Sequence, residues 1–312
     1  MLDFSWPLAA TAITSVSILA ATLYASNATA RSRIIPQNRE RVLIVGCSSG
    51  IGRELALLYA KRGANLALFA RRAQELESLR AECTTLSPAS GCLAISGDAT
   101  QHDDIARCFD RVVEDPQFRH IDTLILCLGV IATRKVMDTP DDMFWQSYEN
   151  IMDTNVRAPI AFARKFLGMM KEKSAAPNIV VVSSVAGKIG SPQRALYTAT
   201  KHALNGFFDS LRVEEPAVHI GVVCPARVDT ALRASALDSQ GVSQDVVAPK
   251  KSKGWLSKGA LSAEECARRI MLASDRRERE VIQPGYYWGA VGLRLVLPSL
   301  IDALARRKYE SQ

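Results

Sequence analysis

The chain has 312 residues, 48% of them hydrophobic and 23% charged, which is typical of a globular protein and excludes a disordered or fibrous one. Its formal net charge of +7 favours an anionic partner, and phosphate-bearing small molecules, acidic lipid surfaces and nucleic acid all qualify. Seven cysteines with neither CxxC nor Cys/His ligand spacing argue against a disulfide framework or a zinc site, and indicate free thiols in a reducing compartment.

The first predicted element is a twenty-residue stretch without charge, from Trp6 to Ala25. This length matches the hydrocarbon core of a bilayer, so we expect residues 1–33 to form a transmembrane anchor and linker. Four arginines lie between positions 31 and 41 and none precedes the stretch, so the positive-inside bias places the rest of the chain in the cytosol. One alternative is a cleaved signal or transit peptide, because Ala28–Ala30 matches a signal-peptidase site. The other alternative is a soluble helix.

Short apolar runs then alternate with helical patterns along the chain. The runs are "RVLIVG" at Arg41, "ANLALFA" at Ala64, "TLILCLG" at Thr123, "NIVVVSS" at Asn178 and "HIGVVCP" at His219. A helix is predicted from about Ile51 to Arg62. Alternation of this kind predicts an α/β fold with a single Rossmann-type, doubly wound parallel sheet flanked by helices. The runs lack polar alternation, which is typical of strands covered on both faces.

A glycine-rich turn follows the first predicted strand and opens the first helix. Its three glycines allow backbone N–H groups to approach a pyrophosphate at a helix N-terminus. The spacing is GxxxGxG, and a plain strand-to-helix turn is the alternative interpretation of the glycines taken alone. The expected cofactor contacts of this turn are Gly46, Ser48, Ser49, Gly50, Ile51 and Gly52.

The end of the second predicted strand bears on the choice of dinucleotide. Ala70 stands where an acidic residue would bind the ribose 2′-hydroxyl of NAD, and Arg71 and Arg72 follow it. Guanidinium groups suit a 2′-phosphate, so the prediction is NADP(H), with Arg71 as a contact. The alternative for the two arginines is a solvated pair of charges at a helix start.

A tyrosine, a lysine and a serine have a spacing that suits proton transfer. Tyr197 and Lys201 lie four residues apart on a predicted helix, so their side chains share one face. An ammonium beside a phenol lowers the phenol pKa from about 10 toward neutrality, which lets it pass protons at pH 7. Ser184, at the end of a predicted strand, is placed to hydrogen-bond the same substrate oxygen. YxxxK alone often occurs by chance, but with the serine and the glycine-rich turn it indicates catalysis.

Taken in order, these motifs resemble the short-chain dehydrogenase/reductase family from about Arg41 to Thr230. The matching stretches are "GCSSGIG", "SGDAT", "DTNVRAP", the strand that ends at Ser184, and "YTATK". The resemblance implies a catalytic tetrad of Asn155, Ser184, Tyr197 and Lys201, in which Asn155 orders a water that feeds protons to the lysine. It also implies NADP(H) contacts from Asp98, Gly129, Tyr197, Lys201, Val228 and Thr230.

Three stretches depart from the family pattern. "LCLG" at Leu126 to Gly129 replaces the family's NNAG, whose first asparagine tethers neighbouring strands. Val45 stands in place of a threonine, and Ala226 replaces the glycine of a PG pair. None of these changes removes a proton-transfer group.

Within the family, the chain is most similar to the membrane-attached branch of 11-beta-hydroxysteroid dehydrogenases, 3-ketodihydrosphingosine reductases and the dehydrogenase/reductase member seven B group. The resemblance implies an NADPH-dependent carbonyl reductase or alcohol dehydrogenase that acts on a hydrophobic, lipid- or steroid-like ketone. It implies a homodimer on the endoplasmic reticulum membrane with its catalytic domain facing the cytosol, and a role in lipid metabolism. The alternative is a membrane-associated, cofactor-binding protein with little catalysis, a redox sensor or scaffold, which the altered "LCLG" segment motivates.

Residues 34–230 are expected to form the dinucleotide-binding catalytic core, and residues 231–312 a substrate lid and a C-terminal helical segment of the same domain. The stretch 231–259 is rich in Ser, Gly and Lys and predicts the lid. Apolar residues near helical spacing between Leu293 and Leu304 predict a helix that lies on a bilayer or packs on the substrate pocket of its own or a neighbouring subunit. We expect neither nucleic acid nor a metal ion as a partner.

Overall fold

The structure is a computed structural model and describes residues 31–230, 232, 236–237 and 260–310. The predicted anchor run Trp6–Ala25 and most of the predicted lid therefore lie outside the described residues. Within the described part of the chain, no helix combines the length and apolar content that a bilayer crossing requires.

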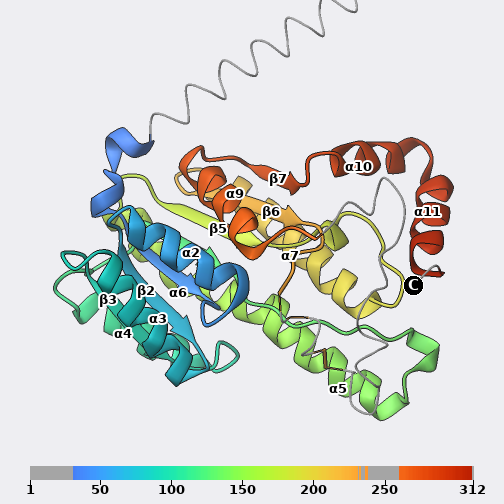
Figure 1. The fold of residues 1–312 in the computed structure, drawn as a ribbon, viewed down its shortest axis with the longest axis horizontal. Coiled ribbons are helices and arrows are strands. Elements are labelled where there is room, and N and C mark those ends of the chain that lie inside the picture. The colour runs from blue at the N-terminus through green and yellow to red at the C-terminus, as the bar shows by residue number, and fades with distance from the viewer. Residues whose placement is uncertain (1–30, 231, 233–235, 238–259, 311–312) are drawn as a thin grey trace, which may run out of the picture.

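Seven parallel strands form one sheet in the order β3-β2-β1-β4-β5-β6-β7 (Figure 1). The strands are β1 (Arg41–Val45), β2 (Asn65–Ala70), β3 (Cys92–Ser96), β4 (Thr123–Leu126), β5 (Asn178–Val182), β6 (His219–Pro225) and β7 (Glu280–Gln283). The order reverses between β1 and β4, and ligands of open α/β sheets bind beyond the carboxyl ends of the strands at such a switch point. This topology confirms the predicted α/β sheet.

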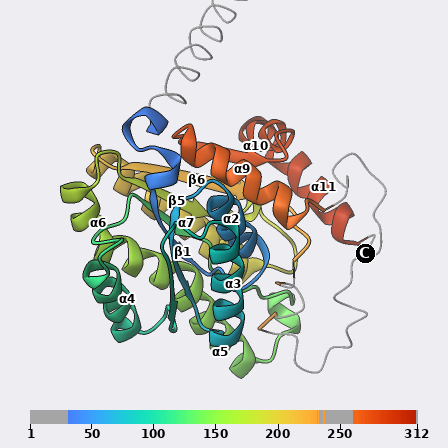
Figure 2. The same ribbon diagram turned by 60° about the vertical axis from the view of Figure 1, so that its left-hand side comes forward.

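Helices cover both faces of the sheet (Figures 1 and 2). They are α2 (Gly50–Lys61), α3 (Ala73–Leu86), α4 (His102–Glu114), α5 (Asp141–Met152), α6 (Ala158–Lys173), α7 (Ala195–Glu214), α9 (Ala263–Asp275), α10 (Tyr287–Val296) and α11 (Pro298–Glu310), with short turns η1 (Gln37–Arg39), η2 (Val136–Asp138), η3 (Asp153–Arg157) and η4 (Val185–Gly187). One face packs against α2, α3 and α9, and the other against α4, α6 and α7.

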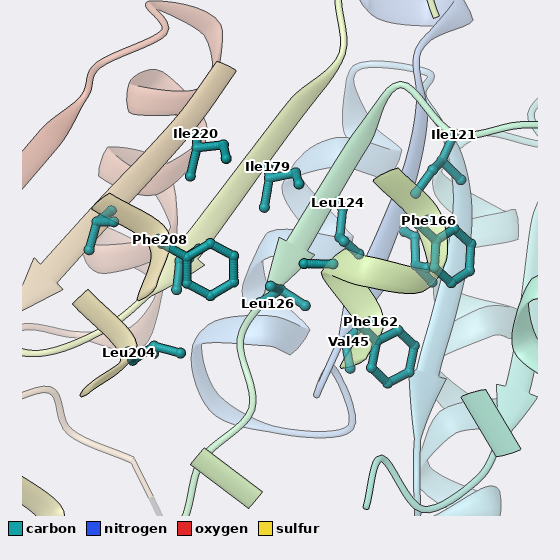
Figure 3. Packing of buried hydrophobic residues seen from close by; sticks show 14 of the residues in the cluster. Val45, Ile121, Leu124, Leu126, Phe162, Phe166, Ile179, Leu204, Phe208 and Ile220 are labelled. Carbon is teal, nitrogen blue, oxygen red and sulfur yellow. The ribbon is translucent and has the colours of Figure 1, made fainter. Parts of the chain in front are cut away.

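The larger core lies between the sheet and the second of these helix layers. Strand residues such as Leu124 and Ile179 meet Phe162 and Phe166 of α6 and Phe208 of α7 there (Figure 3). Successive strand residues point to opposite faces, and both faces are buried, so β1, β4 and β5 are almost wholly apolar. The unbroken Val/Ile/Leu runs of the sequence follow from this double cover.

The five predicted strands are all present, but the sheet also contains β3 and β7, which the sequence patterns did not predict. Both are edge strands: β3 is largely half-buried, and β7 has only four residues. β7 corrects the expectation that residues 231–312 form only a lid and a helical tail. It extends the sheet beside β6, while α9 packs on α2, so residues 263–283 belong to the core.

Arg31, where the described chain starts, is fixed to the core. Its guanidinium donates to Glu40 Oε1 at 2.7 Å and to the Thr123 hydroxyl at 2.6 Å, and Arg31 and Glu40 are both buried. Burial of an ion pair requires such additional hydrogen bonds. The described part of the chain therefore begins at a residue that is fixed to the core.

Candidate active site

A cavity of about 1030 Å³ lies at the carboxyl ends of the strands. All but one of the predicted site residues line it; they are Gly46, Ser48, Ser49, Gly50, Ile51, Gly52, Arg71, Asp98, Gly129, Ser184, Tyr197, Lys201, Val228 and Thr230. The exception is Asn155, which is fully buried behind the cavity wall. The volume is at the upper end of small-molecule pockets, which is suitable for an extended cofactor together with a substrate.

The glycine-rich turn fits a pyrophosphate. Gly46 has a φ of +87°, and a Cβ on it would lie 2.8 Å from the Cα of Leu128, so only glycine brings the turn this close to the end of β4. No side chain among the described residues caps the amino end of α2. The first N–H groups of α2 are therefore available to bind an anion in the cavity. Dinucleotide phosphates bind to helix N-termini in this way.

The two arginines after β2 both line the same part of the cavity as this turn. The Arg72 guanidinium donates to the Ser48 hydroxyl, with Nη2 at 2.9 Å. A phosphate between the turn and the start of α3 would meet both groups, so the residues present fit an NADP-type cofactor. The predicted contacts included Arg71 alone, and the structure adds Arg72.

Asp98 lies two residues after the end of β3 and lines the cavity. Its Oδ1 accepts hydrogen bonds of 2.9 Å from the backbone N–H and the hydroxyl of Thr100. These bonds fix the orientation of the carboxylate at the predicted adenine position.

Three of the predicted catalytic side chains come together on β5, η4 and α7. Ser184 caps the start of η4, where its hydroxyl accepts the N–H of Ala186 at 3.1 Å. Tyr197 and Lys201 lie on successive turns of α7, and the lysine Nζ is 5.7 Å from the centre of the tyrosine ring. The same Nζ donates to the Val182 carbonyl at the end of β5, at 3.2 Å.

The expectation that Lys201 lowers the pKa of Tyr197 is wrong for this structure. Burial raises the pKa of the phenol above its usual value, and a hydrogen bond from Ser184 and the charge of Arg194 act against burial. Burial also lowers the pKa of Lys201 to about 8, which reduces its positive charge near neutral pH. Desolvation by burial is the largest cause of both shifts.

Asn155 lies in the π-helical turn η3, where it holds the segment after β4. Its Oδ1 accepts the N–H of Val130 at 2.8 Å, and its Nδ2 donates to the Val130 carbonyl at 2.9 Å. Nδ2 also donates to the Thr200 hydroxyl at 3.1 Å, and Thr200 in turn donates to the Tyr197 carbonyl at 2.8 Å. π-helical turns often occur at functional sites, and this one joins the helix of the tyrosine to the wall of the cavity.

Comparison with known proteins decides the family. A model of the family described as short chain dehydrogenase matches residues 40–241, the part of the chain that contains the turn, the serine and the tyrosine–lysine pair. The chain belongs to the short-chain dehydrogenase family.

Members of this family are similar to the chain over most of its length. Dehydrogenase/reductase SDR family member 7B of Bos taurus is 30% identical over 87% of this chain and 83% of its own. An 11-beta-hydroxysteroid dehydrogenase of Pinus massoniana is 30% identical over 84% of this chain and 71% of its own. Among solved structures, a short-chain dehydrogenase from Sphingobium yanoikuyae in complex with NADPH matches this chain with a TM-score of 0.67 and 26% sequence identity. The match covers 83% of this chain and 95% of the Sphingobium chain. The chain is an NAD(P)-dependent oxidoreductase of this family.

Hydrogen bonds hold the altered "LCLG" segment of this short-chain dehydrogenase on both sides. The backbone N–H of Cys127 donates to the Val45 carbonyl at 2.9 Å, which continues the pairing of β4 with β1. Val130 directly follows the segment. Asn155 binds both the backbone N–H and the backbone carbonyl of Val130. Backbone and Asn155 contacts therefore hold the segment in which the family's asparagine is missing.

Besides Arg72, the predicted site residues did not include Thr200 and Arg194. Thr200 is fully buried and supports Asn155, and its position in "YTATK" was the only signal for it. Arg194 lines the cavity three positions before Tyr197, and no motif marks it.

Proposed function

We propose that the protein is an NADPH-dependent reductase of a ketone on a hydrophobic substrate. The observation that carries this proposal is the position of the Ser184 hydroxyl and the Tyr197 phenol in one cavity wall, between the glycine-rich turn and an apolar chamber. When bound, the reduced nicotinamide supplies the hydride.

The side chains of the chain itself supply binding and the proton. Tyr197 donates its phenolic proton to the ketone oxygen, and Ser184 donates a hydrogen bond to the same atom. The raised pKa of Tyr197 keeps the phenol protonated before the reaction, as a proton donor requires. Lys201 in the cavity wall and Asn155 behind it replace that proton, by way of a water that Asn155 orders.

The walls beyond Tyr197 support a hydrophobic substrate. They consist of Ile131, Val185, Ile189 and Leu232, together with Tyr286 and Tyr287 and the apolar side chains of α10 and α11. Apolar walls with a few convergent polar groups are the usual composition of a small-molecule site.

NADPH consumption by the full-length protein tests the reaction. A panel of steroid, retinoid, sphingoid and acyl-glycerone ketones covers the hydrophobic ketones, with Tyr197→Phe alongside. Turnover that vanishes in the variant supports the reductase. Tight cofactor binding without turnover on any ketone would instead favour a redox sensor or scaffold.

The choice of cofactor makes a separate prediction. Replacing Arg71 and Arg72 together with Ala is expected to raise the KM for NADPH by about 10- to 100-fold, because charge-assisted hydrogen bonds to the 2′-phosphate are lost. The KM for NADH, which lacks that phosphate, is expected to change far less. Steady-state kinetics with both cofactors measures the difference.

Arg80→Ala is the matched control for this prediction. Arg80 is a cation on α3, the helix that directly follows the two arginines, and it pairs with Glu77 at the surface. It should leave both KM values unchanged. Equal rises for NADPH and NADH in the double variant would mean that the two arginines are merely solvated charges.

We further propose that the apolar surface of α10 and α11 rests on a lipid bilayer. Leu295 and Val296 are 85% and 76% exposed, and Trp288, Leu297 and Leu300 are also exposed. Other residues of the same helices, among them Ala290, Ile301 and Leu304, line the cavity. A substrate dissolved in the bilayer would therefore enter the cavity between these helices.

The start of the described chain favours a bilayer as the occupant of this surface. The described chain begins, in blue, along the same margin of the molecule as α10 in both views (Figures 1 and 2), and the uncharged run Trp6–Ala25 precedes it in the sequence. A membrane that contains the N-terminal run would therefore also contact α10. This is the location expected of an anchored protein with a cytosolic catalytic domain on the endoplasmic reticulum.

Trp288 reports on this membrane contact directly. Brominated lipid in vesicles that hold the full-length protein is expected to quench its emission, because exposed Trp288 would lie at the lipid interface. Trp288→Phe is expected to remove that part of the quenching, whereas Trp145→Phe, which changes an exposed tryptophan of α5, should keep it. Quenching that is the same in Trp288→Phe and the parent would show that α10 does not touch lipid.

A further inference from the structure

The turn η4, which Ser184 caps, is fixed to α7 along one side. The carbonyl of Gly187 in this turn accepts a hydrogen bond of 2.9 Å from the side-chain amide of Asn205. A Cβ on Gly187 would lie 2.8 Å from the carbonyl oxygen of Lys201, so the turn packs directly on the backbone of α7. Both contacts fix η4 against the helix that carries Tyr197.

The far end of the same turn is fixed by two other elements. The carbonyl of Lys188, directly after η4, accepts a hydrogen bond from the Arg294 guanidinium of α10. The Lys188 ammonium pairs with the Glu280 carboxylate of β7, with Nζ and Oε1 3.0 Å apart. Gly187, the residue before Lys188, donates its N–H to the Ser184 carbonyl at 2.8 Å. A short series of hydrogen bonds therefore connects α10 to the backbone of the serine.

Helix α10 rests on the core with little buried surface. Ala290 alone is buried among the described residues of this helix, and the neighbours of Arg294, Leu293 and Leu295, are both exposed. An element with few buried apolar contacts opens locally at a low free energy. Hydrogen bonds from a charged group are among the strongest polar contacts of a protein. The bond from Arg294 therefore matters more to the position of α10 than it would to a deeply buried helix.

The position of the Ser184 hydroxyl bears directly on the chemistry of the site. This hydroxyl lies in the cavity wall with Tyr197 and hydrogen-bonds to the phenol. Rates depend steeply on the placement of such groups, and a displacement of about 1 Å can cost about 10²-fold. Because η4 is connected to α10, a shift of α10 would displace the serine as well.

We propose that Arg294 is a positioning residue of the active site, which holds the Lys188 carbonyl and thereby keeps the Ser184 hydroxyl beside the Tyr197 phenol. Arg294 itself is not among the described residues that line the cavity, so it acts through the turn and not on the substrate. The action of Ser184 on a ketone oxygen rests on the reductase function proposed above. The hold of Arg294 on the turn does not depend on turnover.

Hydrogen exchange of the full-length protein measures this hold without any reaction. Arg294→Met removes the donor and keeps a long side chain. The amides of residues 186–189 bond within the turn, and they are expected to exchange at least about tenfold faster in this variant, because a hydrogen bond from a charged group is lost. Unchanged exchange in Arg294→Met would overturn the proposal.

Arg306→Met is the matched control for this experiment. It makes the same change at an exposed arginine of α11, the helix next to α10 in the chain. Exchange of residues 186–189 should be the same in this variant as in the parent. Faster exchange in both variants would mean that any loss of charge from these two helices loosens the turn, and it would contradict a specific role of Arg294.

Single-turnover kinetics tests whether the hold reaches the serine. Arg294→Met is expected to lower the rate of ketone reduction about tenfold and to leave the Kd for NADPH unchanged, because the glycine-rich turn is intact. Arg294→Lys keeps a cationic donor and should restore part of the rate. In a Ser184→Ala background, Arg294→Met should lower the rate less than about twofold, because the group that Arg294 positions is already absent. An equal loss in both backgrounds would overturn the proposal.

The two measurements together separate this inference from the reductase function. Faster exchange of the turn in Arg294→Met, with no reduction of any ketone by the parent, would support the hold on the turn and contradict the reductase. Ketone reduction by the parent, with the same exchange of the turn in the parent and in Arg294→Met, would support the reductase and contradict Arg294 as a positioning residue.

Discussion

Replacing Tyr197 with Phe is expected to lower the rate of NADPH-dependent ketone reduction by about 10²- to 10⁴-fold, the contribution of general acid catalysis. The variant retains the buried ring and loses only the hydroxyl, which lies in the cavity wall with Ser184. NADPH binding should change little, because the turn and the arginines are intact. Single-turnover kinetics and cofactor titration on the same samples measure the two effects.

Tyr148→Phe is the control for this variant. Tyr148 lies on α5 and is 39% exposed outside the cavity, so its hydroxyl should contribute nothing to turnover. A thermal unfolding midpoint of Tyr197→Phe close to that of the parent would exclude misfolding as the cause of the loss. A variant that keeps more than about a tenth of the activity would contradict the assignment of Tyr197 as the proton donor.

Replacing Gly52 with Ala is expected to destabilise the protein and to abolish cofactor binding. A Cβ at this position would lie 2.2 Å from the carbonyl oxygen of Gly46 and 2.9 Å from the Cα of Cys47. Both atoms belong to the backbone of the phosphate-binding turn, so relief requires α2 and the turn to separate. Overpacking of this kind costs about 1–3 kcal/mol of unfolding free energy, and the displaced turn no longer presents its N–H groups to a pyrophosphate.

Gly168→Ala is the matched control, with the same change in a different place. Gly168 lies within α6, and a Cβ there would meet no described atom within 4 Å. Because glycine is a poor helix former, this variant is expected to be more stable than the parent by about 0.5–1 kcal/mol. Urea unfolding and NADPH titration of both variants give the comparison. Parent-like stability and cofactor affinity in Gly52→Ala would contradict the close packing of the turn.

The sequence alone determined the elements whose signals are local. Unbroken apolar runs predicted β1, β2, β4, β5 and β6, because a strand buried on both faces tolerates no polar alternation. The glycine spacing predicted the turn, because only glycine adopts the φ of Gly46. The spacing of Tyr197 and Lys201 predicted a shared face of one helix, since residues four apart are neighbours there. These inferences need only the period of a helix or strand and the stereochemistry of one residue.

Tertiary structure decided what depends on burial and on contacts between distant segments. The edge strands β3 and β7 have no distinctive pattern, because an edge position and a short length weaken the apolar signal. The hydrogen bonds of Asn155 to Val130 and Thr200 join three parts of the chain that no spacing relates.

The pKa values of the catalytic pair show the same division. Helical spacing predicted attraction between Tyr197 and Lys201, and it also correctly placed them on one face. It gave no measure of desolvation, which raises the pKa of the phenol and lowers that of the ammonium. Arg194 belongs with them, since only the folded chain brings its charge to a cavity lined by the segment after β4 and by residues of α7, α10 and α11. Local stereochemistry is encoded by neighbours in sequence, whereas solvent exclusion is a property of the whole fold. For this reason the sequence by itself determined the motifs, and the tertiary structure decided their electrostatics.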